Sequence, residues 1–172
     1  AFVFEDGVSL NGTLDAGLGD DEINFSDSGM SHGHNVILTD KGSLDGYQGT
    51  DSVILSGFDN VEEIIGGDGL DTIRGLSYAG HWVVDTPVYT YTVDGSGIVL
   101  TLSYFETLVG LSGTDVFTIT AGDNDIDIWG GAGDDTLVML DTARLTGFFN
   151  GEGHYDTVDY TAYTTARDFY LT

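Results

Sequence analysis

Apolar and polar residues alternate in short runs along much of this chain, and clusters of glycine and aspartate separate the runs. The clearest alternating runs are NVILT at 35–39, YTYTV at 89–93, VLTL at 99–102 and FTIT at 117–120. Alternation places successive side chains on opposite faces of a β-strand, and no stretch shows a helical period over a useful length. The pattern predicts an all-β chain of short strands joined by tight turns.

One turn pattern recurs: a glycine-rich tetrapeptide, one or two further residues, an aspartate, and an apolar residue two positions later. Its copies are AGLGDDEIN (16–24), GYQGTDSVI (46–54), GGDGLDTIR (66–74), GLSGTDVFT (110–118), GGAGDDTLV (130–138) and NGEGHYDTV (150–158). The aspartates are Asp21, Asp51, Asp71, Asp115, Asp135 and Asp156, with spacings of 30, 20, 44, 20 and 21 residues. A stacked unit of about 20 to 22 residues explains most of this spacing.

The two longer intervals need their own explanation. We expect the 44-residue interval to hold two units, with VDGSGIVL (93–100) as a degenerate copy that keeps the glycines and lacks the aspartate. The 30-residue interval is then one unit with an insertion. Irregular excursions are therefore expected near residues 25–45 and 76–92.

The apolar residue of each copy predicts where the core lies. Period-two alternation puts this residue on the same face of its strand as the aspartate, so we expect the aspartate to turn inward and the apolar residue to fill the core. The six residues are Ile23, Val53, Ile73, Phe117, Leu137 and Val158. The expected fold is an all-β, right-handed parallel β-helix or β-roll solenoid.

At 172 residues the chain fits one elongated unit, 1–172, with 1–75 and 76–172 as candidate sub-modules. Residues 2–4 and 168–172 both have the character of strands. Because an unpaired strand attracts another strand, we expect both ends to join a neighbouring module or subunit.

Charge narrows the choice of partners. Twenty-nine Asp and Glu residues face four Lys and Arg, for a formal net charge of −25 at pH 7, while 41% of residues are hydrophobic. This apolar content argues against disorder, and the lack of basic clusters excludes nucleic acid and anionic membranes as partners. No apolar run has membrane-spanning length, and the absence of Cys excludes disulfides. A compact form would repel itself unless cations were bound.

Calcium is the cation that these turns favour. A tight turn of small residues exposes its carbonyl oxygens, the following aspartate adds a carboxylate, and stacked turns can surround a Ca²⁺ ion, which takes about six to eight oxygens. The candidate ligands are Asp21, Asp51, Asp71, Asp115, Asp135 and Asp156, with Asp20, Asp134, Gly66, Asp68, Gly130 and Ala132. The alternative is that they are ordinary polar turns, since Asp and Gly favour turns by themselves.

GGDGLDTI and GGAGDDTL resemble the hemolysin-type calcium-binding repeat, the RTX repeat of secreted bacterial proteins. The resemblance implies a parallel β-roll or β-helix with Ca²⁺ in the turns. Repeats of that family usually follow one another every nine residues or so, whereas one such turn recurs here about every 20 residues. We therefore expect calcium along one edge only.

Simpler explanations account for the other candidate chemistry. His32 and His34 in SHGH (31–34) are two residues apart and lack a nearby third ligand, so a loop with solvated histidines is favoured over a transition-metal site. Three acidic pairs, at 20–21, 62–63 and 134–135, could in principle act as catalytic carboxylates. The repeat already explains the two Asp pairs, so paired-carboxylate catalysis is not favoured. Scattered basic residues also argue against a polysaccharide lyase. The chain is expected not to be an enzyme.

The aromatic residues Trp82, Trp129, Tyr89, Tyr91, Tyr104 and Phe105 are expected to fill or cap the core; exposed in a row, they would instead stack sugars. The expected function is a secreted, cell-surface-associated structural module of a bacterial surface protein or self-assembling fibre, folded and rigidified by Ca²⁺. Its partners would be neighbouring modules or copies of itself. The alternative is an adhesin or carbohydrate-binding module that grips a cell-surface glycan, or a calcium-binding appendage of a secreted enzyme.

Overall fold

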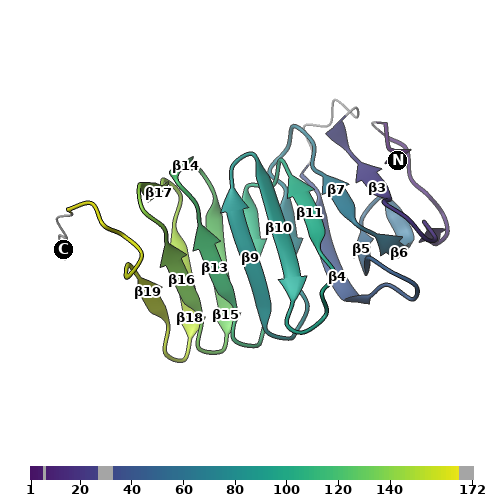
Figure 1. The fold of residues 1–172 in the computed structure, drawn as a ribbon. Coiled ribbons are helices and arrows are strands. Elements are labelled where there is room, and N and C mark those ends of the chain that lie inside the picture. The colour runs from purple at the N-terminus through teal and green to yellow at the C-terminus, as the bar shows by residue number, and fades with distance from the viewer. Residues whose placement is uncertain (6, 27–32, 167–172) are drawn as a thin grey trace.

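The computed structural model describes residues 1–5, 7–26 and 33–166 (Figure 1). The regular structure of these residues is nearly all β-strand and contains no α-helix, which confirms the all-β prediction. A nine-stranded sheet, named sheet A, and an eight-stranded sheet, named sheet B, are accompanied by one pair of short strands. The two large sheets lie face to face, and the chain passes back and forth between them (Figure 1).

Neighbouring strands in each sheet are often distant in sequence. In spatial order, sheet A contains β1 (Phe2–Val3), β3 (Glu22–Asn24), β7 (Glu63–Ile65), β11 (Leu100–Ser103), β10 (Val88–Val93), β9 (Gly80–Asp85), β13 (Val116–Ile119), β16 (Thr136–Met139) and β19 (Thr157–Asp159). Sheet B contains β18 (Phe149–Gly153), β15 (Asp127–Ala132), β12 (Thr107–Val109), β8 (Thr72–Arg74), β4 (Asn35–Lys41), β5 (Tyr47–Asp51), β6 (Ile54–Val61) and β2 (Leu14–Asp15). The short pair is β14 (Gly122–Asn124) and β17 (Ala143–Leu145).

Most neighbouring strands are parallel, and their register follows the sequence repeat. In sheet A, Phe117 pairs with Leu137, and Leu137 pairs with Val158. Parallel strands need a crossover connection, which the opposite sheet provides. Equivalent positions of successive repeats therefore lie one above another.

One continuous cluster of buried apolar side chains fills the space between the sheets. Of the six apolar residues predicted from the repeat, Ile23, Ile73, Phe117 and Leu137 are buried, as expected. Val53 is only half-buried. Val158 is exposed because β19 is the outermost strand of sheet A among the described residues.

Each large sheet contains one antiparallel strand among its described strands. In sheet A, β10 runs opposite to its neighbours β9 and β11, and in sheet B, β5 runs opposite to β4 and β6. The two strands meet across the core, where the rings of Tyr47 and Tyr91 lie 5.6 Å apart. Two insertions, one per sheet, therefore keep the sheets similar in width.

This arrangement corrects the expectation for residues 93–100. They contain the turn between the antiparallel strands β10 and β11 of sheet A, so they are not a degenerate copy of the stacking turn. Glycines mark both kinds of turn, and the sequence pattern does not distinguish them. The excursion expected near 76–92 contains β9 and most of β10, and the one near 25–45 contains β4.

The predicted aromatic core is confirmed for four residues and wrong for two. Trp82, Tyr89, Tyr91 and Phe105 are buried. Tyr104 is 56% exposed, and Trp129 is partly exposed on the outer face of sheet B. Alternation explains the position of Trp129, because its neighbour Ile128 takes the inward position.

Candidate functional site

The acidic turns do not share one edge of the molecule. Turns 16–21, 110–115, 130–135 and 150–156 lead from sheet B to sheet A, but turn 66–71 leads from β7 in sheet A to β8 in sheet B. Asp51 ends β5 and precedes a tight return to β6 within sheet B. The expectation of metal turns along one edge is therefore wrong for Asp51 and Asp71, because the turn motif is local and does not encode which sheet follows.

Each of four turns folds its aspartate against the glycine five residues earlier. A Cβ added to Gly130 would lie 2.3 Å from Asp135 Oδ2, and one added to Gly110 would lie 2.4 Å from Asp115 Oδ2. The corresponding separation is 2.7 Å for Gly66 and Asp71 and 2.1 Å for Gly151 and Asp156. The carboxylate occupies the space that a larger residue would need, so the glycine and the aspartate form one structural unit.

The carboxylates of the B-to-A turns form a column linked by hydrogen bonds. Gly80 N–H donates to Asp115 Oδ1 (2.8 Å), Asp115 N–H donates to Asp135 Oδ1 (2.8 Å), and Asp135 N–H donates to Asp156 Oδ1 (3.0 Å). Asp115 and Asp135 are fully buried, whereas Asp156 is exposed. Each carboxylate therefore fixes the start of the neighbouring strand in sheet A.

Asp71 does the same at the opposite edge. Its Oδ1 accepts a hydrogen bond from His34 N–H (2.6 Å), and its Oδ2 accepts one from Gly67 N–H (2.7 Å). Its own N–H donates to Glu106 Oε2 (2.7 Å). Both edges therefore use a buried carboxylate to hold the backbone of the adjacent repeat.

Sequence reasoning missed two residues that take the place of the aspartate. Asp21 N–H donates to Glu62 Oε2 (2.8 Å), and Glu106 accepts from Asp71 N–H in the same way. Each glutamate stands two residues before a fully buried apolar residue, Ile64 or Leu108, which is the spacing of the repeat. The two-residue spacing to a buried apolar residue was therefore present in the sequence, but the glycine-rich turn expected before it was absent.

Several buried carboxylate oxygens lack a partner. Five of the seven unpartnered buried side-chain atoms among the described residues are carboxylate oxygens. They are Asp45 Oδ1, Asp51 Oδ2, Glu62 Oε1, Asp115 Oδ2 and Asp135 Oδ2. Burial and the charge of Asp135 raise the pKa of Asp115 to about 8, and burial also raises the pKa of Asp135. These oxygens need a proton or a cation.

A second acidic group lies around the first turn. Gly19 N–H donates to Asp45 Oδ2 (3.1 Å), while Asp45 Oδ1 and Glu62 Oε1 have no partner. Burial and the charges of Asp45, Asp21 and Asp20 raise the pKa of Glu62. Asp20 and Asp21 were candidate ligands, but Asp45 and Glu62 were not expected beside them, because Asp45 belongs to an insertion outside the repeat.

Asp51 is engaged in a different contact. Its Oδ1 lies 3.2 Å from His34 Nδ1, and the His34 ring stacks on Phe25 with centroids 3.9 Å apart. Burial works to raise the pKa of Asp51, but hydrogen bonds from His34 and Val53 N–H outweigh it and lower the pKa. The expectation of a solvated His34 is wrong, since this residue is buried beside a carboxylate; His32 lies outside the described residues.

Most of the remaining candidate ligands either accept hydrogen bonds from the backbone or are exposed to solvent. Ala132 C=O accepts from Gly113 N–H (2.9 Å), and Asp134 Oδ1 accepts from Tyr155 N–H (3.0 Å). Asp20 and Asp68 are exposed, whereas Gly66 and Gly130 are buried.

The donor chemistry fits a hard cation, because the unpartnered atoms are carboxylate oxygens. Only a few of these oxygens lie close to any one position, because successive turns are separated along the stack. Within the described ranges, no three His, Cys, Asp or Glu side chains converge closely enough to hold a metal ion. The unpartnered oxygens that could contact a cation belong to Asp45, Asp51, Glu62, Asp115 and Asp135.

Fold and site together define an all-β protein of two mixed sheets joined by acidic, glycine-bearing turns. No model of a known protein family matches the chain, no curated protein matches it, and no solved structure matches it. In the part of the chain that the structure describes, no helix has the length and apolar character to cross a bilayer.

Proposed function

We propose that this chain is an extracellular, calcium-dependent structural module of a bacterial surface protein or fibre. We further propose that its repeats, which resemble the RTX type, form a right-handed parallel β-helix or β-roll solenoid. The observation that carries the proposal is the column of buried carboxylates with unpartnered oxygens at Asp115 and Asp135. Ionised and stacked, these groups oppose the compact state until a cation neutralises them.

The chain's own residues supply the mechanism. Asp115 accepts from the first backbone N–H of β9, and Asp135 accepts from the N–H of the residue just before β13, so the order of each turn depends on the turn beside it. Bound calcium would supply the positive charge that the sequence lacks. Folding would then depend on calcium, which favours a low-calcium compartment for export and a calcium-rich exterior for assembly.

A structural role also accounts for the direction of the carboxylates. Asp115 and Asp135 are fully buried and accept backbone N–H groups, so a substrate would not reach them. We therefore propose a non-catalytic protein. The outermost strands β1 and β19 each have one partner among the described strands, which suits addition of a neighbouring module or another copy of the chain.

The test is thermal unfolding followed by circular dichroism in EDTA, in Ca²⁺ and in Mg²⁺. We expect Ca²⁺ to raise the Tm by several degrees or more and Mg²⁺ to raise it less, because Mg²⁺ gives up its water ligands reluctantly. The variant with Asp115→Asn and Asp135→Asn should lose much of the calcium-dependent rise, whereas Asp94→Asn, an exposed control, should retain it. An identical Tm for the wild-type protein in EDTA and in Ca²⁺ contradicts the proposal.

A second candidate function is favoured by a different observation. Trp129 lies partly exposed on the outer face of sheet B, with Arg74 and Glu152 beside the same depression. This arrangement favours a carbohydrate-binding module, because an accessible indole flanked by polar side chains can stack a sugar ring.

A further inference from the structure

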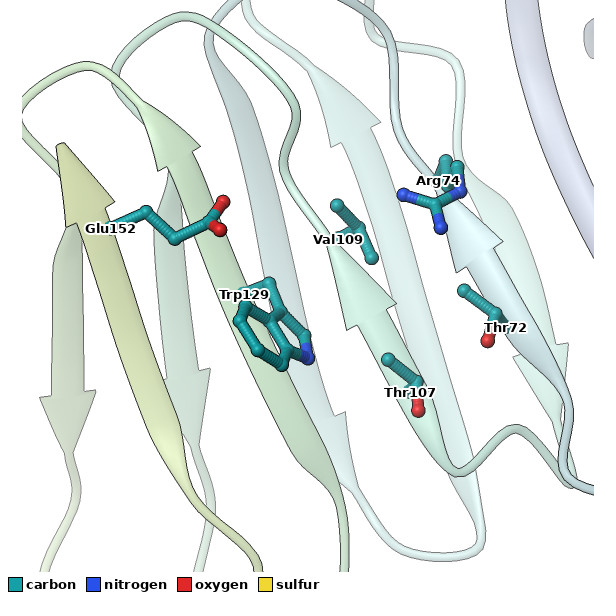
Figure 2. Close-up of a pocket in the computed structure, with 6 residues that line it drawn as sticks. All are labelled: Thr72, Arg74, Thr107, Val109, Trp129 and Glu152. Carbon is teal, nitrogen blue, oxygen red and sulfur yellow. The ribbon is translucent and has the colours of Figure 1, made fainter.

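A shallow depression of about 350 Å³ crosses the outer face of sheet B. Its lining comes from four adjacent parallel strands, β8, β12, β15 and β18. Neighbouring strands lie about 4.8 Å apart, so the depression extends over roughly 14 Å. Figure 2 shows Trp129 near its middle, with Glu152 on one side and Val109 and Arg74 on the other.

Two apolar side chains, Trp129 and Val109, lie among the polar residues that line the depression. Trp129 pairs in register with Val109 on β12, and Val109 pairs with Arg74 on β8, so the three residues form one row on the outer face. The ring of Phe148 meets Trp129 edge to face at 5.1 Å and 87°, which holds the indole in place.

Polar groups lie on both sides of Trp129 and Val109. Arg74 Nε donates to Asn35 Oδ1 (3.1 Å), and no carboxylate of the described residues forms an ion pair with the guanidinium, although the chain is rich in acids. The Glu152 side chain is exposed at the opposite end, and Thr72 and Thr107 pair in register along one side. Donors and acceptors thus lie around an aromatic face.

We propose that this depression binds a neutral oligosaccharide, with one sugar ring stacked on Trp129. The C–H bonds on one face of a pyranose carry partial positive charge and pack against the negative face of an indole. The sugar hydroxyls both donate and accept hydrogen bonds, so they match the Arg74 guanidinium and the Glu152 carboxylate at the two ends. This inference rests on the second candidate function above, for which it names the ligand class, and it does not depend on calcium.

Charge and backbone pairing select this ligand over others. A net charge of −25 repels acidic polysaccharides and nucleic acids, and one arginine does not offset it. An extended peptide that adds to a sheet needs free backbone groups, but β12 and β15 are each paired on both sides. A neutral ligand that uses side chains and one aromatic face fits both conditions.

Tryptophan fluorescence offers a direct readout, because the chain has two tryptophans and the other one, Trp82, is fully buried. The folded protein is titrated with oligomers of cellulose, chitin and xylan, and with oligogalacturonate as the acidic probe, in EDTA and again in Ca²⁺. We expect at least one neutral oligomer to shift the Trp129 emission and protect it from acrylamide in whichever condition the protein is folded. This makes a failure of sugar binding distinguishable from a failure of the calcium proposal.

Variants locate the binding on the molecule. Isothermal titration calorimetry measures the affinity of each variant, because Trp129→Ala lacks the fluorescent reporter. Trp129→Ala should weaken binding about tenfold or more, since it removes the stacking surface. Arg74→Gln should weaken it less, and Tyr78→Ala, which truncates an exposed aromatic outside the depression, should leave it unchanged. Circular dichroism confirms that each variant is folded. Equal affinity of Trp129→Ala and the wild-type protein, a preference for oligogalacturonate, or an emission change caused only by self-association would overturn the proposal.

Discussion

The two glycines of an acidic turn are required for different reasons. The glycine five residues before the aspartate makes room for the carboxylate, as Gly130 does for Asp135. In the turns of Asp115 and Asp135, the glycine two residues before the aspartate adopts a positive φ, which is 117° at Gly113 and 140° at Gly133. Glycine alone adopts such angles at little cost. At the residue scale, the motif therefore needs one glycine to leave space for the carboxylate and a second glycine to adopt a positive φ.

Gly130→Ala tests the steric requirement. The new methyl would overlap Asp135 Oδ2 and force the turn to shift, so we expect a loss of about 1–3 kcal/mol in the free energy of unfolding and a lower Tm. Gly12→Ala is the matched control, since its added Cβ meets no atom within 4 Å. Denaturant unfolding of both variants gives the comparison. Equal stability of the two would show that Asp135 moves aside freely.

At the element scale, two buried tyrosines support the pair of antiparallel strands. Tyr47 on β5 donates from its hydroxyl to Ile98 C=O (3.0 Å) and accepts from Val93 N–H (3.1 Å). The Tyr91 hydroxyl on β10 accepts from Leu76 N–H (2.9 Å). Each ring fills the core while its hydroxyl satisfies backbone groups outside the parallel ladder.

Removal of the Tyr91 hydroxyl should therefore be costly. Tyr91→Phe leaves Leu76 N–H buried without this acceptor, and we expect a loss of about 1–3 kcal/mol in the free energy of unfolding. Tyr78→Phe, at an exposed ring, should be neutral. Urea unfolding measures both variants, and a neutral Tyr91→Phe would mean that water replaces the hydroxyl.

Asp141 makes the segment after β19 sensitive to acid. Hydrogen bonds from Thr164 and Thr165 lower the pKa of Asp141 to about 2, below its ordinary value of 3.8. The carboxylate therefore stabilises the docked segment above about pH 4, and this contribution is lost as the pH falls toward 2. We expect the amide resonances of Thr164 and Thr165 to titrate with a midpoint near 2, and not to titrate in Asp141→Asn. A midpoint near 4 in the wild-type protein would contradict the contact.

Alternation along the chain predicted the strands and most inward residues, because burial of one face is a local property of period two. It did not predict the direction of β10, since YTYTV alternates like any parallel strand and only pairing sets direction. Glu62 and Glu106 were missed because their turns lack the expected glycines. The sequence did not predict that the acidic turns lie on two edges, because a turn motif determines its own local geometry and not its position in the stack.

At the scale of the whole molecule, repulsion between the acidic residues adds to the cost of folding. Twenty-nine acidic residues on a chain of 172 raise the free energy of the folded state wherever the charges lie within a Debye length of each other. That length falls from about 10 Å at 0.1 M ionic strength to about 3 Å at 1 M.

Monovalent salt should therefore stabilise the protein in EDTA. We expect the Tm to rise steadily with NaCl up to about 1 M, and choline chloride to produce a similar rise because screening does not depend on the identity of the cation. Calorimetry in both salts makes the comparison. A rise with NaCl alone would point to sodium binding in the turns instead of screening.

The antiparallel strands β5 and β10 also have an evolutionary consequence. Each insertion replaces one strand by an antiparallel set of three, so it adds two strands and shifts its sheet by two steps relative to the other sheet. The second insertion, in the opposite sheet, restores the alignment. If only one of the two insertions were lost, the later strands of one sheet would no longer lie opposite their present partners in the other sheet. Descendants of the same ancestor are therefore expected to carry both insertions or neither, so that their length differences occur as correlated pairs.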